Sequence, residues 1–421
     1  MPGRVPDSFS TCCRVRNEVP VTISSPRNTA SAKGTASPSR WALGVMVSDA
    51  PLMGIIFTVL PPILPLIAVH FGGSQQGRLM AQMVMTLPSL GLIVGGAVGG
   101  WLVDRWGVRS VLFVGLLGYG LFGSAGLYLD SAASLLVSRF LLGVAATAIT
   151  TATAWMLAES YAADRRTHLL GYRNSLGSFA GIVTTFLAGP IAEHAGWRAP
   201  FAFYLVSLGI LMVALLSLPR FTHRAEAETG SAVNVLLPLW PIYVIAVLLY
   251  VVIFAPFTQL SFLLSDEGIN RPSVQSWVIG MGSVGTTLSA ASYGRIKTDF
   301  GVHFTLVLLI VLLGTGNVLV GLTHTAVGGA VGIGVAGLGG GLAVPCLCDW
   351  VLDRAPVEVR GRAVGLLYSA MFFGDFLSPI FFHPLGTMWG AHGAFVVLGG
   401  TVMASALVVG FLKKQLALQT A

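Results

Sequence analysis

Charged side chains are scarce in this chain, since Asp, Glu, Lys and Arg together make up 10% of its residues. A typical soluble domain has about 25% charged residues. Hydrophobic residues make up 54% of the chain, and its mean hydropathy is +0.80. So few charges cannot cover a surface that faces water on every side, which excludes a soluble globular protein. We therefore expect an integral membrane protein in contact with the lipid bilayer.

Cysteine is also rare, and the common catalytic motifs are missing. Cys12, Cys13, Cys346 and Cys348 form neither a disulfide framework nor a zinc-binding spacing. The pair at 346 and 348 could bind a soft metal, but small apolar packing is the simpler interpretation. There is no Walker loop, dinucleotide fingerprint, HExxH or serine nucleophile elbow. We expect no metal, no cofactor and no enzymatic activity.

The net charge of +7 does not indicate a nucleic-acid partner, because the basic residues lie in short turns between apolar runs. Residues 1–40 are rich in Ser, Thr, Pro and Arg and contain no apolar core of a secretory signal. They are interpreted as a disordered cytoplasmic tail. A start codon assigned too early and an organelle transit peptide are the alternatives.

Long apolar runs predict twelve membrane helices, because about 20 apolar residues in a helix span a bilayer. The predicted fold class is therefore an all-α membrane protein. The predicted helices lie near residues 42–69, 79–102, 110–128, 132–156, 170–192, 199–219, 236–262, 274–294, 303–322, 326–348, 363–385 and 391–412. The predicted organisation is a tail (1–40), a six-helix half (41–219), a cytoplasmic linker (220–235), a second six-helix half (236–412) and a cytoplasmic C-terminal tail (413–421).

Basic residues are distributed unequally between the two sets of turns. One set carries most of the Lys and Arg, whereas the other carries only Arg78, Arg198 and Arg271. Positively charged turns remain on the cytoplasmic side of a membrane. The distribution predicts a protein of the plasma (inner) membrane with both termini in the cytoplasm.

An offset of 194 residues aligns the two predicted halves without a gap. The aligned pairs include Pro62 and Pro256, Gly91 and Gly285, Gly100 and Gly294, Gly107 and Gly301, Glu159 and Asp353, Arg166 and Arg360, and Gly196 and Gly390. Parallel repeats of this kind enclose a central path and rock against each other about a site near the membrane midplane.

The repeat pairs two charged turns, "GGWLVDRWGVRS" at 99–110 and "GRIKTDFG" at 294–301. Glycine lets the backbone turn sharply, and the charges can hold the two halves together and release them. The predicted gating residues are Gly100, Asp104, Arg105, Gly107, Arg109, Gly294, Arg295, Asp299 and Gly301. The turns after the fourth and tenth helices supply Glu159, Arg166, Asp353 and Arg360, interpreted either as salt bridges that close an inner gate or as a solvated basic surface.

The first of these turns resembles the loop signature of the major facilitator superfamily. Val108 stands where a second basic residue is common. Arg139 and Gly143, in "RFLLG", are similar to the buried-Arg motif of the fourth helix. Gly189 and Pro190 resemble the core of the antiporter motif in the fifth helix, although Ala192 and Glu193 replace its glycine pair and Thr185 an upstream glycine. The resemblance covers about residues 41–412.

This resemblance implies two pseudo-symmetric six-helix bundles and a secondary transporter of a small molecule, usually a monomer. We expect proton-coupled efflux, as in the twelve-helix drug/proton antiporter branch. The alternatives are a proton-coupled importer of a metabolite such as an organic acid or sugar, and a membrane sensor that transports nothing.

Ionisable residues inside a bilayer are functional candidates, because charge is costly there. Asp49 is either a pathway acid or the cap of a helix that begins near residue 50. Asp375 lies in the middle of the eleventh helix, where no cap explains it. Arg139 is expected to couple to a carboxylate, with a side chain reaching the outer surface as the alternative. Gln259 beside Pro256 is a weaker pathway candidate, and His383 and His392 are interpreted as solvated turn residues.

Overall fold

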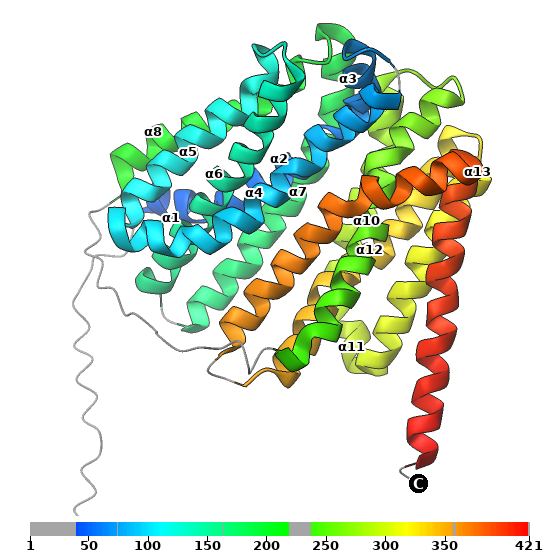
Figure 1. Cartoon of the computed structure of the whole chain (residues 1–421). Helices are drawn as coiled ribbons and strands as arrows, with labels where there is room; N and C mark the ends of the chain where they lie inside the picture. Colours follow the sequence, from blue (N-terminus) through cyan, green and yellow to red (C-terminus); the bar gives the residue numbers. More distant parts are fainter. Residues whose placement is uncertain (1–38, 74, 162, 219–236, 357–358, 420–421) are drawn as a thin grey trace, which may run out of the picture. The chain divides into compact units, whose positions relative to one another are not determined.

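The computed structural model describes residues 39–73, 75–161, 163–218, 237–356 and 359–419 (Figure 1). The described residues form one compact unit. Almost all of the predicted tail and the whole predicted linker lie outside the described residues.

The elements of the first half are α1 (Arg40–Met46), α2 (Asp49–Thr58), η1 (Pro61–Ile63), α3 (Leu64–His70), α4 (Gln75–Trp106), α5 (Val108–Gly123), η2 (Ser124–Leu127), α6 (Ala132–Ser160), α7 (Ala163–Ala195), η3 (Ala199–Leu205) and α8 (Val206–Ser217). Those of the second half are η4 (Leu237–Leu239), α10 (Trp240–Asp266), α11 (Pro272–Leu322), α12 (Ala326–Arg354) and α13 (Arg360–Gln419).

Ten helical segments in the described residues are long and apolar enough to span a membrane. Two of them, α11 and α13, contain one glycine each with non-helical backbone angles, Gly301 and Gly390. Divided at these glycines, the segments correspond to the twelve predicted spans. The last segment differs in its end, because α13 continues to Gln419 and the predicted tail from residue 413 is therefore helical almost throughout.

The repeat is visible in the backbone at its turns. Gly107 has φ 78° and ψ 148°, and its counterpart Gly301 has φ 79° and ψ 168°. Gly196 and Gly390 form a second pair, with φ 84° and 68°. Only glycine adopts these angles without strain. Both members of each pair therefore turn the chain in the same way, as the alignment predicts.

The repeat is equally visible where helices cross. A Cβ atom added to Gly91 of α4 would collide with the carbonyl of Phe140 in α6, and one on Gly143 with the carbonyl of Pro88. The same collisions recur 194 residues later, because Gly285 meets the carbonyl of Gly334 and Gly337 meets that of Gly282. Small residues let membrane helices approach this closely. The equivalent helix pairs, α4 with α6 and α11 with α12, therefore have the same crossing.

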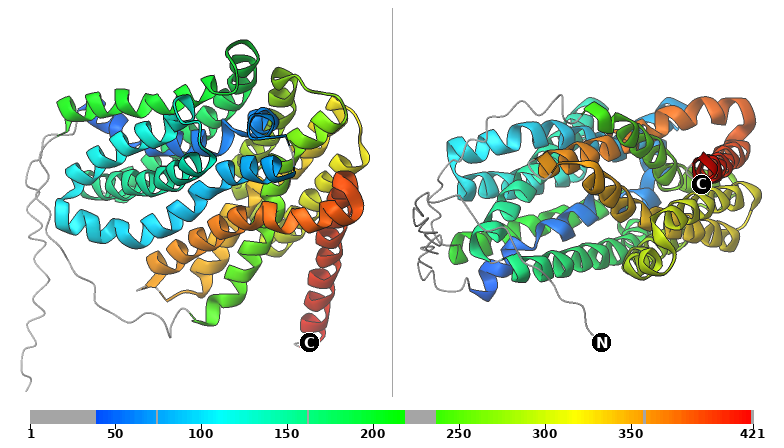
Figure 2. Two further views of the ribbon diagram at one scale, coloured as in Figure 1. Left: turned by 45° about the horizontal axis from the view of Figure 1, so that its top comes forward. Right: turned by 90° about the horizontal axis from the view of Figure 1, so that it is seen from below.

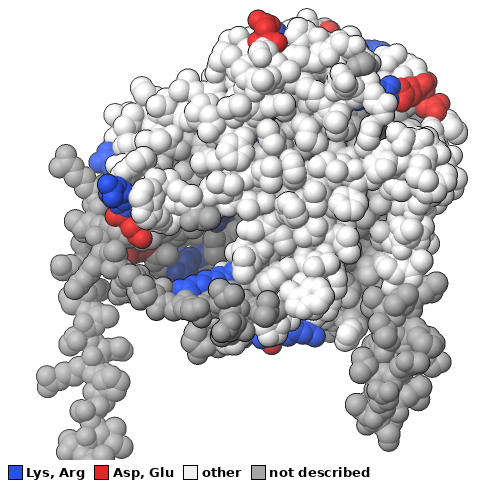
Figure 3. Space-filling view, in the orientation of Figure 1, with Lys and Arg blue, Asp and Glu red and all other residues white. Residues whose placement is uncertain are grey.

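The two ends of the bundle carry different turns. We call the end with the turns at Gly107 and Gly301 the inner end, following the predicted orientation, and the end with residues 71–73, 267–271 and 323–325 the outer end. Figure 3 shows that charged residues on the visible face gather near the two ends, with a wide uncharged band between them. Large apolar side chains of the membrane-spanning helix α8, such as Met212 and Leu216, are exposed. Such a surface is suited to lipid.

Candidate functional site

One face of α4 forms polar contacts with the second half. In Figures 1 and 2, α4 lies along α13. Positions 78, 82 and 89 project from the same side of a helix with 3.6 residues per turn. We call these three contacts the α4 ladder: Arg78 Nη1 donates to Asp266 Oδ2 at 2.9 Å, Gln82 Nε2 donates to Gln259 Oε1 at 2.8 Å, and the Ser89 hydroxyl donates to the Asp375 carboxylate.

Asp375 is the deepest member of the ladder. Its side chain is 1% exposed, and Ser89 is its hydrogen-bond partner through Oδ2. Its second oxygen, Oδ1, has no hydrogen-bond partner in the described part of the chain. A buried carboxylate is ordinarily paired with a cation or fully hydrogen-bonded. Asp375 has neither arrangement in the described part of the chain, and its one hydrogen bond comes from the other half.

Gln259 is buried, at 8% exposure, and its contact with Gln82 joins the two halves. Near it, the Ser261 hydroxyl donates to the carbonyl of Pro61, which is a further contact across the halves. The sequence indicated Gln259 and Asp375 but not their partners. Gln82 and Ser89 are uncharged residues in an apolar helix, and no sequence signal distinguishes them from ordinary packing residues.

Helices α7 and α11 form the second contact at the outer end. Gly189 lies so close to α11 that a Cβ atom would collide with the carbonyl of Pro272 and the hydroxyl of Ser276. One turn further, Glu193 accepts a hydrogen bond from Arg271 Nε at 3.1 Å and one from the backbone of Ser273 at 3.3 Å. The Gly189–Pro190 element named from the sequence thus lies at this contact.

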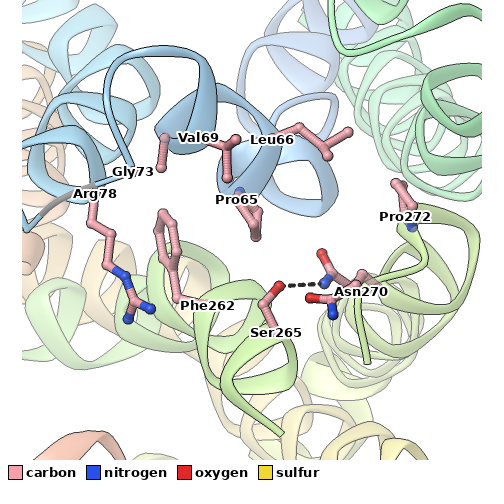
Figure 4. Close-up of a pocket in the computed structure, with 11 residues that line it drawn as sticks. Pro65, Leu66, Val69, Gly73, Arg78, Phe262, Ser265, Asn270 and Pro272 are labelled. Atoms are coloured by element: carbon pink, nitrogen blue, oxygen red, sulfur yellow. Dashed lines mark hydrogen bonds between the residues drawn. The ribbon is translucent and has the colours of Figure 1, made fainter. Parts of the chain in front are cut away.

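A small cavity remains between the halves at the outer end (Figure 4). Its volume is about 280 Å³. Pro65, Leu66 and Val69 line one side, Phe262, Ser265 and Asn270 line the other, and Arg78 lies at its edge. The outer end is therefore closed by polar and backbone contacts rather than by tight apolar packing throughout.

Three aromatic side chains lie on the inner side of Asp375. The ring of Phe57 in α2 is 5.7 Å from that of Phe254 in α10 and 6.1 Å from that of Phe372 in α13. All three are partly exposed, whereas Asp375, one helical turn from Phe372, is buried. On the inner side, Figure 3 shows a hollow with Lys and Arg on its wall. The structure is closed at the outer end and hollowed at the inner end.

Asp49 forms an ion pair with Arg173 of α7. The side chains are 1% and 16% exposed, respectively. The chain leaves helical geometry at Val47, and α2 begins with Asp49, so a helix does start where the capping alternative placed it. Asp49 is nevertheless not its N-cap, which is Ser48. The sequence indicated Asp49 but not its partner Arg173.

The expected carboxylate partner of Arg139 is wrong. Arg139 is fully buried, and it donates to the carbonyls of Val84 and Gly123 and, at 2.7 Å, to the hydroxyl of Tyr204. Its guanidinium also lies 4.8 Å from the centre of the Tyr204 ring. These partners satisfy a buried cation without a carboxylate. All of them belong to the first half, so Arg139 holds α4, α5 and η3 together and has no contact with Asp375.

Arg105 and Arg109 of the first charged turn contact residues of their own half. Arg105 lies over the Trp101 ring, and Arg109 donates to the carbonyl of Leu215 at 3.3 Å. Asp104, Arg295 and Asp299 are exposed, and Gly100 and Gly294 have open space beside them. In the second half, the sequence missed Asp349, which accepts from Lys297 and Tyr293, both at 2.5 Å.

The predicted inner salt bridges are absent in this conformation. Among the described residues, no ion pair joins Glu159 or Arg166 to Asp353 or Arg360. Arg360 instead donates to the carbonyl of Ala355 at 3.3 Å. The physical reason is the hollow at the inner end, which leaves these side chains in solvent.

Two helical halves related by a repeat, with the buried Asp375 at the contact between them, are typical of a membrane transporter. The sequence profile described as Major Facilitator Superfamily matches residues 52–271 and 265–417. The chain belongs to this superfamily, whose members carry small molecules across membranes.

Its relatives and structural neighbours differ in what they transport. The chain is 24% identical over 357 residues to the hexuronate transporter of Bacillus subtilis, covering 77% of this chain and 84% of that one. It is 24% identical to the class B tetracycline resistance protein of Escherichia coli, covering 82% and 88%. Multidrug resistance protein 1 of Bacillus subtilis is 26% identical, but the match spans only 64% of that protein. The nucleoside transporter NupG is 13% identical with a TM-score of 0.69, covering 89% of this chain and 98% of that one, which shows a shared fold.

Proposed function

We propose that this protein is a proton-coupled exporter of a small organic molecule that works by alternating access. The observation that carries the proposal is Asp375, buried between the halves with one carboxylate oxygen bonded to Ser89 and the other without a partner. A proton-coupled carrier needs a group whose ionisation changes when its surroundings change from wet to dry. Asp375 meets this requirement, because its surroundings are formed by both halves.

In the proposed cycle, the outer end opens when the α4 ladder and the contact of Gly189 with α11 separate. Water from outside then reaches Asp375, which binds a proton. Closure restores the ladder, and the inner end opens to the cytoplasm. Asp49 and Arg173 face this inner side, and the ion pair is the proposed place where a charged group of the substrate competes for one of the partners.

Two observations favour export. Resistance proteins are among the relatives that match over most of their length, and the Gly189–Pro190 element lies at the outer contact that must open and close. The alternative is import, which the likeness to a hexuronate transporter supports. We further propose that the working unit is a single chain in the inner membrane with both termini in the cytoplasm.

Flux in proteoliposomes with an imposed pH gradient tests the proposal. Purified protein is reconstituted, and a panel of amphipathic cations, organic acids and sugars is assayed with the gradient in each direction. Export coupled to proton entry predicts that the substrate moves opposite to the protons. Movement in the same direction would establish the import alternative, and flux that ignores the gradient would contradict proton coupling.

A further inference from the structure

Three side chains of the second half meet at the outer end, apart from the contact between the halves. Glu267 follows α10, His324 lies in the turn between α11 and α12, and His392 lies two residues after the kink of α13 at Gly390. Glu267 Oε1 is 2.8 Å from His324 Nδ1 and 2.7 Å from His392 Nε2. We call this group the outer triad. His392 is therefore not the solvated turn residue expected from the sequence.

In the outer triad, hydrogen-bond donors and acceptors cannot all be matched unless a positive charge is added. His392 Nδ1 is 3.0 Å from the carbonyl oxygen of Gly321, which can only accept, so Nδ1 must carry a hydrogen. In a neutral ring, Nε2 then presents a lone pair to the Glu267 oxygen, which also only accepts. Either a second proton or a metal ion must lie between them.

The surroundings of the Glu267 oxygen favour a metal ion over a proton on one ring. One oxygen faces two ring nitrogens, and all three ligand atoms lie within 4.8 Å of one another. A single cation between the three atoms would satisfy all of them at once.

We propose that Glu267, His324 and His392 bind a divalent transition metal ion of the Zn²⁺ type. Two imidazole nitrogens and one carboxylate oxygen are a common zinc ligand set, with a fourth position left for water. Zinc bonds of about 2.0–2.2 Å place ligand atoms roughly 3.3 Å apart, so the triad needs to open by only a few tenths of an ångström. The His324 side chain is 64% exposed and has room for this adjustment.

Two further features fit such a site. The bond from His392 Nδ1 to the Gly321 carbonyl is the kind of outer contact that orients a metal-binding histidine. Glu267 also directly follows Asp266, which pairs with Arg78 of the first half. A bound ion would fix the end of α10 to the α11–α12 turn and to α13, and so steady the residue that forms the outermost contact of the α4 ladder.

Metal binding to the full-length protein tests the proposal. The protein is purified in detergent without a polyhistidine tag, stripped with a chelator, and titrated with Zn²⁺ by calorimetry; Co²⁺ absorption reports the ligand geometry. We expect one ion per chain. His324→Ala and Glu267→Gln should each weaken binding by at least about tenfold. His383→Ala is the matched control, because His383 is an outer-end histidine that lies 3.5 Å from Gln75, outside the triad.

His324 is exposed, so the His324→Ala variant should still fold. A loss of Zn²⁺ binding in this variant would therefore not be explained by unfolding. In chelator, His324→Ala should unfold at the wild-type temperature, and only the rise in unfolding temperature on adding Zn²⁺ should disappear. Unchanged Zn²⁺ affinity in His324→Ala would overturn the proposal. So would a wild-type protein without saturable uptake, which would leave a doubly protonated His392 as the charge within the triad.

Discussion

Ser89 and Asp375 lie 286 residues apart, yet the Ser89 hydroxyl donates a hydrogen bond to the buried Asp375 carboxylate across the contact between the halves. The bond joins the middle of α4 to the middle of the part of α13 that precedes the kink at Gly390. In the proposed cycle this bond breaks when the outer end opens. The cycle thus predicts a second environment for Asp375 when the halves separate.

Asp375→Asn should abolish flux driven by a pH gradient while leaving downhill exchange of substrate. The amide keeps the shape and accepts the Ser89 bond but cannot bind and release a proton. Gradient-driven flux and exchange are measured separately in proteoliposomes. Ser378→Ala is the control, because Ser378 is buried one turn away but bonds to Val251 within its own half. Full gradient-driven flux in Asp375→Asn would end the role proposed for this acid.

Asp49→Asn should lower the free energy of unfolding by up to about 3 kcal/mol, because Arg173 would keep a buried charge without its partner. The double variant Asp49→Asn/Arg173→Gln should lose less than the sum of the two single variants. Thermal unfolding in detergent gives all three values. Strictly additive losses would show that the pair contributes no coupling, and unaltered transport in both single variants would remove it from the substrate path.

Gly189→Ala should favour the conformation with an open outer end. The added methyl group would collide with the carbonyl of Pro272 and the hydroxyl of Ser276. A cysteine at Thr86, which is fully buried on the ladder face of α4, should then react faster with an impermeant thiol reagent, about tenfold for each 1.4 kcal/mol of weakened closure. Gly171→Ala in the same helix has open space beside it and should change nothing. Equal rates in both variants would contradict the role of Gly189.

Gly107→Ala and Gly301→Ala should destabilise the protein by similar amounts, roughly 1–3 kcal/mol each. Both glycines have positive φ and open space around them, so the cost comes from the backbone alone. Gly100→Ala, in the helix before the first turn and also with open space, should be neutral or slightly stabilising. Unfolding temperatures compare the three. A large difference in stability between Gly107→Ala and Gly301→Ala would mean that the two turns, although equivalent in backbone geometry, are not equivalent in energy.

Cysteine labelling in intact cells should place the two ends on opposite sides of the membrane. With the native cysteines replaced by serine, Asp130→Cys at the outer end should react with an impermeant reagent from outside. Asp299→Cys at the inner end should react only after the membrane is opened. Both side chains are exposed, so burial does not confuse the result. The reverse pattern would invert the orientation deduced from the basic residues.

The sequence was sufficient for features that depend on local composition. Apolar runs located the spans, and Gly107 and Gly301 marked the equivalent turns because no other residue adopts their backbone angles comfortably. Asp375 was found because a carboxylate in an apolar helix is unusual. These signals are properties of single residues and their neighbours.

Partners and conformation could not be predicted in the same way. Ser89 and Gln82 carry no distinguishing signal, and their bonds join residues of different halves. The error at Arg139 has a related cause, because carbonyl groups and Tyr204 take the place of the carboxylate that the resemblance to the family motif implied. The arrangement of the two halves decides which end of the bundle is closed. The periodicity of apolar residues in the sequence contains no information about that arrangement.

The glycine crossings within each half have a mechanical consequence. At Gly91 with Phe140, and at Gly285 with Gly334, backbone meets backbone with no side chain between them to change rotamer. At Gln82 with Gln259 and Arg78 with Asp266, the contact is made by side chains that can exchange their partner for water. The crossings inside each half are therefore stiff and the contacts of the α4 ladder are compliant, while the approach of Gly189 to the Pro272 carbonyl adds a backbone contact between the halves. A methyl group added at a glycine crossing inside one half should lower the stability of the protein. A change on the ladder face of α4 should instead alter how long the central path is open to each side of the membrane.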